Sequence, residues 1–306
     1  MRHSRSQAFA DALPAARSGE SGNHWSSVAD DPNDPHALAM RASVLRQAWI
    51  PEIPNRVGFL LERCKDKRVL DIGCVAHDLA RMDAANWLHG QIAGVAASCL
   101  GVDIHGEGVS EMRRRGFQAI EHDLAQGLGP LDLEKPFDVI VAGELIEHVE
   151  SMGMLFDAAA ALLVDGGELI ITTPNPWAPH RVRAAQLGIV WENTDHILFA
   201  FPSGIAELAS RRGLRLAEAT STVLERNDYA GVRDRIKALR RRVRGRHWET
   251  VGYASLGDAR VARVGALFSG AWIVAKLRQL QRPRRRFLGE SFVYVVRPAQ
   301  TGAQNE

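Results

Sequence analysis

The sequence has few cysteines, and their spacing does not suit a metal site or a redox pair. Only three occur among 306 residues, Cys64, Cys74 and Cys99, and no C-x-x-C pair is present. Structural zinc sites and thioredoxin-like motifs need such spacings. We therefore expect reduced thiols in a cytoplasmic protein, and no zinc site built from cysteine.

Long apolar runs are also missing. No run reaches the roughly 18 residues of a membrane-spanning helix. The first residues, "MRHSRSQAFADALPAARS", are partly basic but lack the apolar core of a signal peptide. Hydrophobic residues make up 46% and charged residues 24%, the range of ordinary globular proteins. The length suits one large α/β domain with additions, or two modest domains.

The charge is unevenly distributed. Segment 226–290 holds 17 Lys and Arg against 5 Asp and Glu, a balance of +12. Because the whole chain carries +2, the remainder carries −10. One segment of an almost neutral protein is thus strongly basic, which indicates a specialised surface.

From residue 67 onward, short apolar segments alternate with helical patterns. The predicted strands are 68–73, 99–104, 117–123, 137–143, 166–173, 214–224 and 290–298. Among the helices expected between them is one over 85–98. Continuous apolar strands that alternate with helices predict an α/β fold, in which a mostly parallel sheet is covered on both faces.

The composition along the sequence also predicts a division of the chain into segments. Residues 1–35 are poor in large aliphatic side chains, which indicates a mobile tail, and helices are expected within 36–66. Residues 67–225 together with 290–298 form the α/β domain. Residues 226–289 form a basic, helical insertion before the last strand.

Acidic residues follow three of the predicted strands. Asp71 and Gly73 end the first, Asp103 ends the second and Asp123 ends the third. Ligands of open parallel sheets bind beyond the carboxyl ends of the strands. Gly73 would allow a close approach of backbone to ligand. Asp103 is placed to accept hydrogen bonds from ribose hydroxyls, and Asp123 to meet an adenine amino group.

These residues resemble the class I S-adenosylmethionine-dependent methyltransferases. Asp71-Ile72-Gly73-Cys74-Val75-Ala76-His77 matches the start of the first motif, acidic-x-Gly-x-Gly-x-Gly. Further matches are "GVDI", "EHDL", "FDVIVAGELIEHV" and "LVDGGELIITTPNPW", within about 65–224. The resemblance implies a Rossmann-like seven-stranded, doubly wound sheet of order 3-2-1-4-5-7-6. It also implies cofactor contacts from Asp71, Gly73, Cys74, His77, Asp103, Ile104, Asp123, Leu124, Gly143 and Glu144.

The first motif departs from the family at its second half. Val75 and His77 replace two glycines, and a β-branched Val75 resists positive φ, so we expect a loop of different shape. The segment between Gly73 and Asp103 is also long. One interpretation is that four residues in or beside this segment rebuild the lost contacts around the methionine half of the cofactor: His77, Asp78, Trp87 and His89. The other is that Trp87 is a core residue and His89 a surface residue. A nicotinamide cofactor is disfavoured, because its pyrophosphate needs G-x-G-x-x-G.

The segment "GELIEHVESM" places Glu144, Glu147 and His148 on one face of a helical turn. The three could hold a divalent cation such as Mg²⁺, and the resemblance supports this, because quinone-precursor O-methyltransferases share E-x-x-E-H. The alternative is that Glu147 and His148 brace the cofactor wall.

His196, beside Asp195, is a candidate base that would take a proton from a hydroxyl, and His148 is the other. "TPNPW" at 173–177 departs from the N-P-P-aromatic motif of nucleic-acid N-methyltransferases and follows the wrong strand. The acceptor is therefore expected to be a hydroxyl. By resemblance it belongs to a saccharide or a lipid-linked small molecule.

The basic insertion has three interpretations. Arginine clusters flank the apolar run 264–275, which holds Leu267, Trp272 and Ile273. The segment is a lid on the protein's own sheet, a contact with an anionic membrane or lipid carrier, or a grip on nucleic acid. The last would fit an RNA methyltransferase. The lost glycines leave a further alternative, a non-catalytic binding module.

Overall fold

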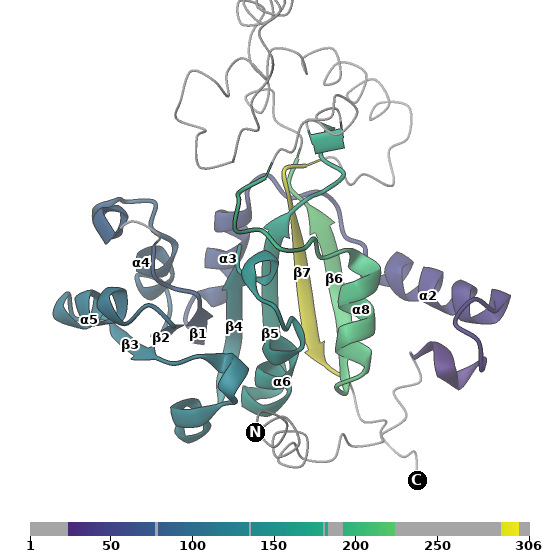
Figure 1. Cartoon of the computed structure of the whole chain (residues 1–306), viewed down its shortest axis with the longest axis horizontal. Helices are drawn as coiled ribbons and strands as arrows, with labels where there is room; N and C mark the ends of the chain where they lie inside the picture. Colours follow the sequence, from purple (N-terminus) through teal and green to yellow (C-terminus); the bar gives the residue numbers. More distant parts are fainter. Residues whose placement is uncertain are drawn as a thin grey trace, which may run out of the picture.

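Seven strands form one twisted sheet at the centre of the molecule (Figure 1). We describe residues 24–76, 79–134, 136–179, 181–182, 192–223 and 289–299 of a computed structural model. The strands are β1 (Arg68–Ile72), β2 (Ser98–Asp103), β3 (Gln118–Glu121), β4 (Phe137–Gly143), β5 (Leu163–Pro174), β6 (Leu214–Ser221) and β7 (Ser291–Pro298). Their order is β3-β2-β1-β4-β5-β7-β6, and β7 runs antiparallel to both neighbours. This confirms the predicted strand order.

Helices cover both faces of the sheet. The α-helices are α2 (Pro35–Ala48), α3 (Arg56–Cys64), α4 (Leu88–Ala93), α5 (Gly106–Arg114), α6 (Gly153–Leu162) and α8 (Pro202–Ser210). One apolar core joins α6 and α8 to β1, β4, β5 and β7, and a second joins α3 and α4 to the opposite face. The 3₁₀ turns are η1 (Trp25–Ser27), η2 (Leu79–Asp83), η3 (Leu124–Gln126), η4 (Gly129–Leu133) and η5 (Ile146–His148).

The central strands are buried along nearly their whole length. In β4, "FDVIVAG", only Asp138 and Gly143 are partly exposed. Such unbroken burial is what a parallel strand between two helical layers requires. Because β1 to β5 run parallel, their carboxyl ends lie along one edge of the sheet, the upper edge in Figure 1.

Most strands differ from their predicted bounds by one to three residues, and one helix differs by more. The helix expected over 85–98 is confined to Leu88–Ala93 and is preceded by the 3₁₀ turn η2. Its C-cap is Gly94, a poor helix former. Strand β5 begins at Leu163, earlier than expected, and its pairing with β4 is irregular between Phe137 and Val139.

The described part of the predicted tail, residues 24–34, contacts α8. The carboxylate of Glu207 on α8 binds His24, Trp25 and Arg41, the last from α2. The rest of the tail lies outside the described residues, as does the basic insertion up to residue 288. The predicted division into segments and the predicted membrane contact stay predictions. Among the helices of the described ranges, none has the length and hydropathy to span a bilayer.

Candidate functional site

The loop after β1 begins with a glycine that the structure requires. Gly73 has φ +76°, and its N–H donates to the Val102 carbonyl at 2.8 Å. A Cβ atom there would lie 2.9 Å from Leu145 Cδ1. Val75 does not adopt positive φ, because only Asp66 and Glu144 do so among the described non-glycine residues. Val75 therefore lacks the left-handed backbone that glycine adopts readily, and the expected difference in loop shape stays a prediction.

The predicted ribose and adenine residues lie along the edge formed by β2 and β3. Asp103 accepts from the Val75 N–H at 2.9 Å and from the His105 N–H at 3.0 Å, which fixes its carboxylate. Asp123 caps η3 by accepting from the Ala125 N–H at 2.9 Å. Ile104 is 72% exposed beside Asp103, which suits an apolar platform for a ligand ring.

Other predicted cofactor residues face the interior. Asp71 is buried, and its Oδ2 lies 2.9 Å from His89 Nδ1. The Cys74 thiol is buried 3.6 Å from the Met112 sulfur. The side chains of Asp71 and Cys74 therefore point away from the edge. Leu124 is also buried. Only the backbone of this group can meet a ligand at the edge. His77 lies outside the described residues.

The three thiols are held protonated. Burial, followed by the charge of Asp71, raises the pKa of Cys64 to about 12. The same two causes raise the pKa of Cys74 and of Cys99 far above the ordinary range of a thiol. The thiolate, which is the reactive nucleophile, is therefore disfavoured at all three positions.

The end of β4 carries a strained residue. Glu144 has φ +53°, and its N–H donates to the carbonyl and the hydroxyl of Thr172 at 2.9 and 3.1 Å. Non-glycine residues with such φ concentrate at functional sites. Arg56, from α3, lies 3.9 Å from the Glu144 carboxylate and brings a positive charge to this edge. A side chain on the neighbouring Gly143 would meet Leu88 at 2.8 Å.

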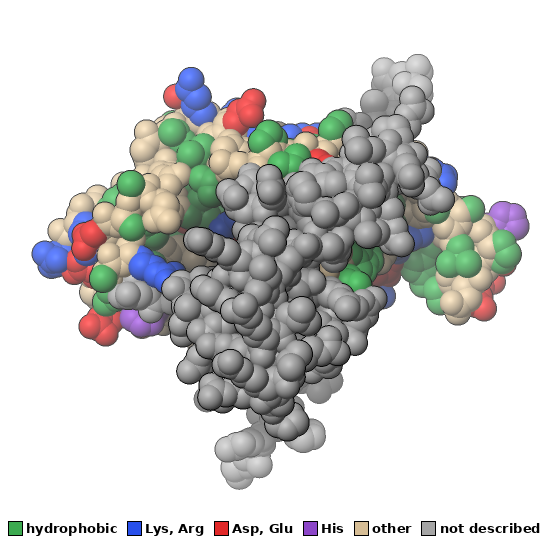
Figure 2. Space-filling view, turned by 90° about the horizontal axis from the view of Figure 1, so that it is seen from above, with side chains coloured by type: hydrophobic (Ala, Val, Ile, Leu, Met, Phe, Trp, Pro, Cys, Tyr) green, Lys and Arg blue, Asp and Glu red, His purple; other side chains and the backbone are tan. Residues whose placement is uncertain are grey.

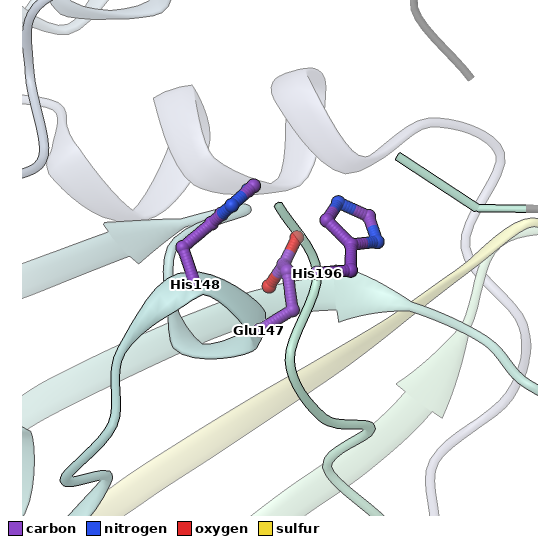
Figure 3. Close-up of side chains that lie close together, drawn as sticks. All are labelled: Glu147, His148 and His196. Carbon is purple, nitrogen blue, oxygen red and sulfur yellow. The ribbon is translucent and has the colours of Figure 1, made fainter. Parts of the chain in front are cut away.

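Glu147, His148 and His196 converge at the same edge (Figure 3). One ligand atom from each lies within 4.8 Å of the others, and the two imidazole rings are 4.7 Å apart and edge to face. Glu147 is fully buried, and its Oε2 accepts from Thr173 Oγ1 at 3.0 Å. Burial, followed by the charge of Glu144, raises the pKa of Glu147 to about 8.

Each imidazole has a carboxylate partner, but not the one that adjacency in the sequence suggested. Asp195 Oδ2 lies 3.2 Å from Nδ1 of His148, and Glu192 Oε2 lies 2.7 Å from Nδ1 of His196. The expected Asp195–His196 pair is wrong, because side chains of adjacent residues point apart whereas Glu192 stands four residues before His196. Glu144, predicted with Glu147 and His148 as a cation ligand, lies outside the group; His196 takes its place.

Neither Glu192 nor Arg181 was identified as a site residue from the sequence. The buried guanidinium of Arg181 binds Glu192 through Nε and the Glu290 carboxylate through Nη1 at 3.1 Å. It therefore joins the partner of His196 to the residue that precedes β7. The i, i+4 spacing of Glu192 and His196 was the available signal for Glu192; Arg181 had none.

Apolar side chains are exposed on the described parts of the chain between β5 and α8. Four large hydrophobic residues of the segments that follow β5 are partly exposed: Trp177, Val182, Ile197 and Phe201. The rings of Trp177 and Phe201 are 5.1 Å apart, and the N–H of Ile197 donates to the Glu147 carbonyl at 2.9 Å. Seen from above, the described residues carry hydrophobic, basic and acidic side chains intermixed (Figure 2).

The architecture and this edge agree with the comparisons to known proteins. Residues 43–219, more than half of the chain, match a sequence family described as a methyltransferase domain. The chain belongs to this family of methyltransferases. Its strand order is the one that the resemblance to class I S-adenosylmethionine-dependent methyltransferases implied, with Asp71 in β1, Asp103 at the end of β2 and Asp123 just after β3. The methyltransferase is thus an enzyme, and S-adenosylmethionine is its cofactor.

Similar curated proteins are each named ubiquinone biosynthesis O-methyltransferase. The one from Nitrobacter winogradskyi is 28% identical over 51% of this chain and 59% of its own length. The one from Thiobacillus denitrificans is 25% identical over 69% and 86% of the two chains, and the one from Xylella fastidiosa 29% over 56% and 63%. The methyltransferase thus spans less than two thirds of two of these relatives.

Two solved structures are similar over part of the chain. A SAM-dependent methyltransferase from Archaeoglobus fulgidus has a TM-score of 0.45 and 16% identity, covering 79% of this chain and 90% of that one. A magnesium protoporphyrin IX methyltransferase from Synechocystis, with bound SAH, has a TM-score of 0.41 and 18% identity over 55% and 74%.

Proposed function

We propose that this methyltransferase methylates an aromatic hydroxyl on a small acceptor with an apolar portion, and that His148 is the base. The single observation that carries the proposal is the pairing of His148 with Asp195 at 3.2 Å beside the buried Glu147. A carboxylate accepts but does not donate, so Nδ1 of His148 carries the proton and Nε2 carries the lone pair. An imidazole oriented in this way can take a proton at neutral pH.

The transfer is an in-line displacement. The acceptor oxygen forms a bond to the methyl carbon, the carbon–sulfur bond breaks, and S-adenosylhomocysteine leaves. The hydroxyl proton passes to Nε2 of His148. The sulfonium is already a good leaving group, so the protein mainly aligns the partners and removes a proton. A phenolic hydroxyl, with a pKa of about 10, gives its proton to imidazole far more readily than a saccharide hydroxyl does.

Two observations support an aromatic, partly apolar acceptor. The similar curated proteins are named as O-methyltransferases of ubiquinone biosynthesis. The exposed Ile197, which follows His196 in the chain, places an apolar side chain beside the imidazoles. The exposed rings of Trp177 and Phe201 lie 5.1 Å apart on the segments after β5. A lipid-linked small molecule, one of the two acceptors expected from the sequence, satisfies both. The saccharide acceptor stays a prediction without such support.

The group of Glu147, His148 and His196 also fits a divalent cation. Its support is the Oε1 atom of Glu147, which is buried and has no hydrogen-bond partner among the described residues. Two imidazoles and one carboxylate suit a transition metal better than Mg²⁺, which prefers oxygen ligands. When bound, such a cation would lower the pKa of the acceptor hydroxyl. His148 would then serve as a ligand instead of the base.

Transfer of a labelled methyl group tests the proposal. Catechol with an alkyl chain and a panel of saccharides are offered in parallel, each with and without EDTA. We expect label on the catechol oxygen, and His148→Ala to lose about 10²- to 10⁴-fold in kcat while binding of S-adenosylhomocysteine is unchanged. His36→Ala, on the exposed face of α2, is the matched control.

Each contrary result is specific. Label on a saccharide alone refutes the aromatic acceptor. Full activity of His148→Ala refutes the base. Loss of wild-type activity in EDTA, with recovery on adding Zn²⁺ or Mn²⁺, refutes His148 as base and assigns it to the cation.

A further inference from the structure

We propose that Trp87 and His89, at the start of α4, are positioning residues that shape the loop after β1 for the methionine half of S-adenosylmethionine. They do so in place of the two glycines that Val75 and His77 have replaced. Neither residue touches the cofactor edge directly. Each acts through the loop or through the strand that leads into it.

The contacts are specific and buried. Trp87 Nε1 donates to the Cys74 carbonyl at 3.1 Å, and His89 Nδ1 lies 2.9 Å from Oδ2 of Asp71. His89 is 1% exposed, so it is not the surface residue that one interpretation of the sequence expected, and Trp87 lies in the core. Because a carboxylate only accepts, the imidazole is the donor. The bond from His89 thus fixes Asp71 near the end of β1. The bond from Trp87 fixes Cys74 in the loop that follows.

Two glycines are required near the loop, in β2 and in α4, where a side chain would collide with the residues that pack under the loop. A Cβ atom on Gly101 in β2 would lie 2.6 Å from the Cys74 sulfur and 3.0 Å from His89 Cε1. A Cβ atom on Gly90 would lie 2.9 Å from Trp87 Cε3. These two glycines give Trp87 and His89 the room to pack under the loop. Val75 is not in the left-handed region, so the loop does not adopt the conformation that a glycine would allow. Contacts from the Trp87 and His89 side chains fix its conformation instead.

The strand order indicates which half of the cofactor is affected. Asp103 and Asp123, the ribose and adenine candidates, follow β2 and β3, whereas His148 follows η5 after β4. β1 lies between β2 and β4, and Figure 1 shows α4 on that side of the sheet. A cofactor that reaches from the adenine candidate to the acceptor must cross the end of β1 with its methionine half. Asp103 has a second bond, from the His105 N–H, that does not involve the loop after β1.

Two ligands separate this role from a merely structural one. Calorimetry measures the affinity of the full chain for S-adenosylhomocysteine and for 5′-methylthioadenosine, which lacks the amino-acid portion. Trp87→Phe keeps an aromatic ring against Phe117 but removes the indole donor. We expect its affinity for S-adenosylhomocysteine to fall about five- to tenfold, the effect of one lost hydrogen bond, and its affinity for 5′-methylthioadenosine to stay within about twofold.

His89 supplies the second pair of variants. His89→Leu leaves the buried Asp71 carboxylate without its donor and can unfold the protein, so Trp87→Phe keeps the proposal testable by itself. His89→Asn restores a donor, and we expect it to hold S-adenosylhomocysteine within about threefold of wild type. Gln91→Ala is the matched control, because Gln91 on α4 bonds the Ala85 carbonyl and leaves the loop untouched.

Unchanged affinity of Trp87→Phe for both ligands would overturn the proposal. So would an equal loss for both ligands together with a lowered melting temperature, since that is the signature of general destabilisation. A loss for S-adenosylhomocysteine alone, absent in Gln91→Ala, supports it.

Discussion

The Glu147 carboxyl is fully buried beside two imidazoles, and its pKa is raised to about 8 by burial and by Glu144. The folded protein therefore keeps this proton up to about pH 8, whereas the unfolded chain releases it near 4.5. Across that window the unfolded state binds fewer protons, so the free energy of unfolding falls as pH rises and levels off above pH 8.

Glu147→Gln removes this titration while keeping the shape of the side chain. In EDTA, we expect the variant to equal wild type near pH 4 and to exceed it by roughly 3–5 kcal/mol at pH 8. Denaturant unfolding across that range measures the difference. A difference that does not change with pH would show that the Glu147 carboxyl is ionised in the folded protein.

Gly73 allows a second prediction at the scale of the residue. Gly73→Ala places a Cβ atom at φ +76° and 2.9 Å from Leu145, whereas Gly116→Ala has φ +89° and nothing within 4 Å. We expect Gly116→Ala to cost about 1 kcal/mol of stability and Gly73→Ala about 2, with weaker binding of S-adenosylhomocysteine only in the latter. Equal losses of stability in Gly73→Ala and Gly116→Ala, with unaltered binding, would mean that the Leu145 side chain moves aside without an energetic penalty.

The sequence located several residues but could not assign their partners. Asp103 and Asp123 were predictable because the carboxyl end of a parallel strand is marked by the end of an apolar run. The partner of His148 was not, since Asp195 is brought to it by a segment that follows a different strand. Burial of His89 in α4 was likewise not predictable, because it depends on Asp71 in β1 and Gly101 in β2.

At the scale of elements, Arg181 connects the segment after β5 to the start of β7. Its guanidinium is buried between Glu192 and Glu290, so removing it leaves two carboxylates without their cation. We expect Arg181→Ala to lose about 3–5 kcal/mol of stability. We also expect it to reduce kcat more than affinity for S-adenosylhomocysteine, because Glu192 orients His196, whose ring packs edge to face on the proposed base His148. Denaturant unfolding and calorimetry measure the two effects.

Arg212→Ala is the matched control, since Arg212 binds the partly exposed Asp157 of α6 and neither Glu192 nor Glu290. We expect it to cost about 1 kcal/mol or less. An Arg181→Ala variant as stable and as active as this control would show that the link does not position His196.

Element bounds were predicted well where apolar periodicity was unbroken and poorly around glycine. The helix expected over 85–98 is only Leu88–Ala93, because Gly90 and Gly94 lower its helical preference and Trp87 leaves the helix to support the loop. The helix α2 (Pro35–Ala48) begins one residue before the range 36–66 in which helices were expected from apolar spacing, because Asp34 caps it and Pro35 occupies its first position.

At the scale of the whole molecule, the strand order followed from family resemblance rather than from periodicity. Alternation of strands and helices predicts a parallel sheet, but it does not place β7 between β5 and β6. That placement brings Glu290 to Arg181 and so connects the last strand to the acceptor side of the sheet. The same sheet puts the cofactor candidates and the imidazoles along a single edge.

The central claim is that this edge binds S-adenosylmethionine although the loop after β1 has lost two glycines. Calorimetric titration of S-adenosylhomocysteine into the wild-type protein and into Asp103→Ala tests it most directly. We predict binding at about micromolar affinity in the wild type, reduced at least tenfold in the variant through loss of the ribose contact. No binding by a folded wild-type protein, or equal binding by Asp103→Ala, would contradict the account.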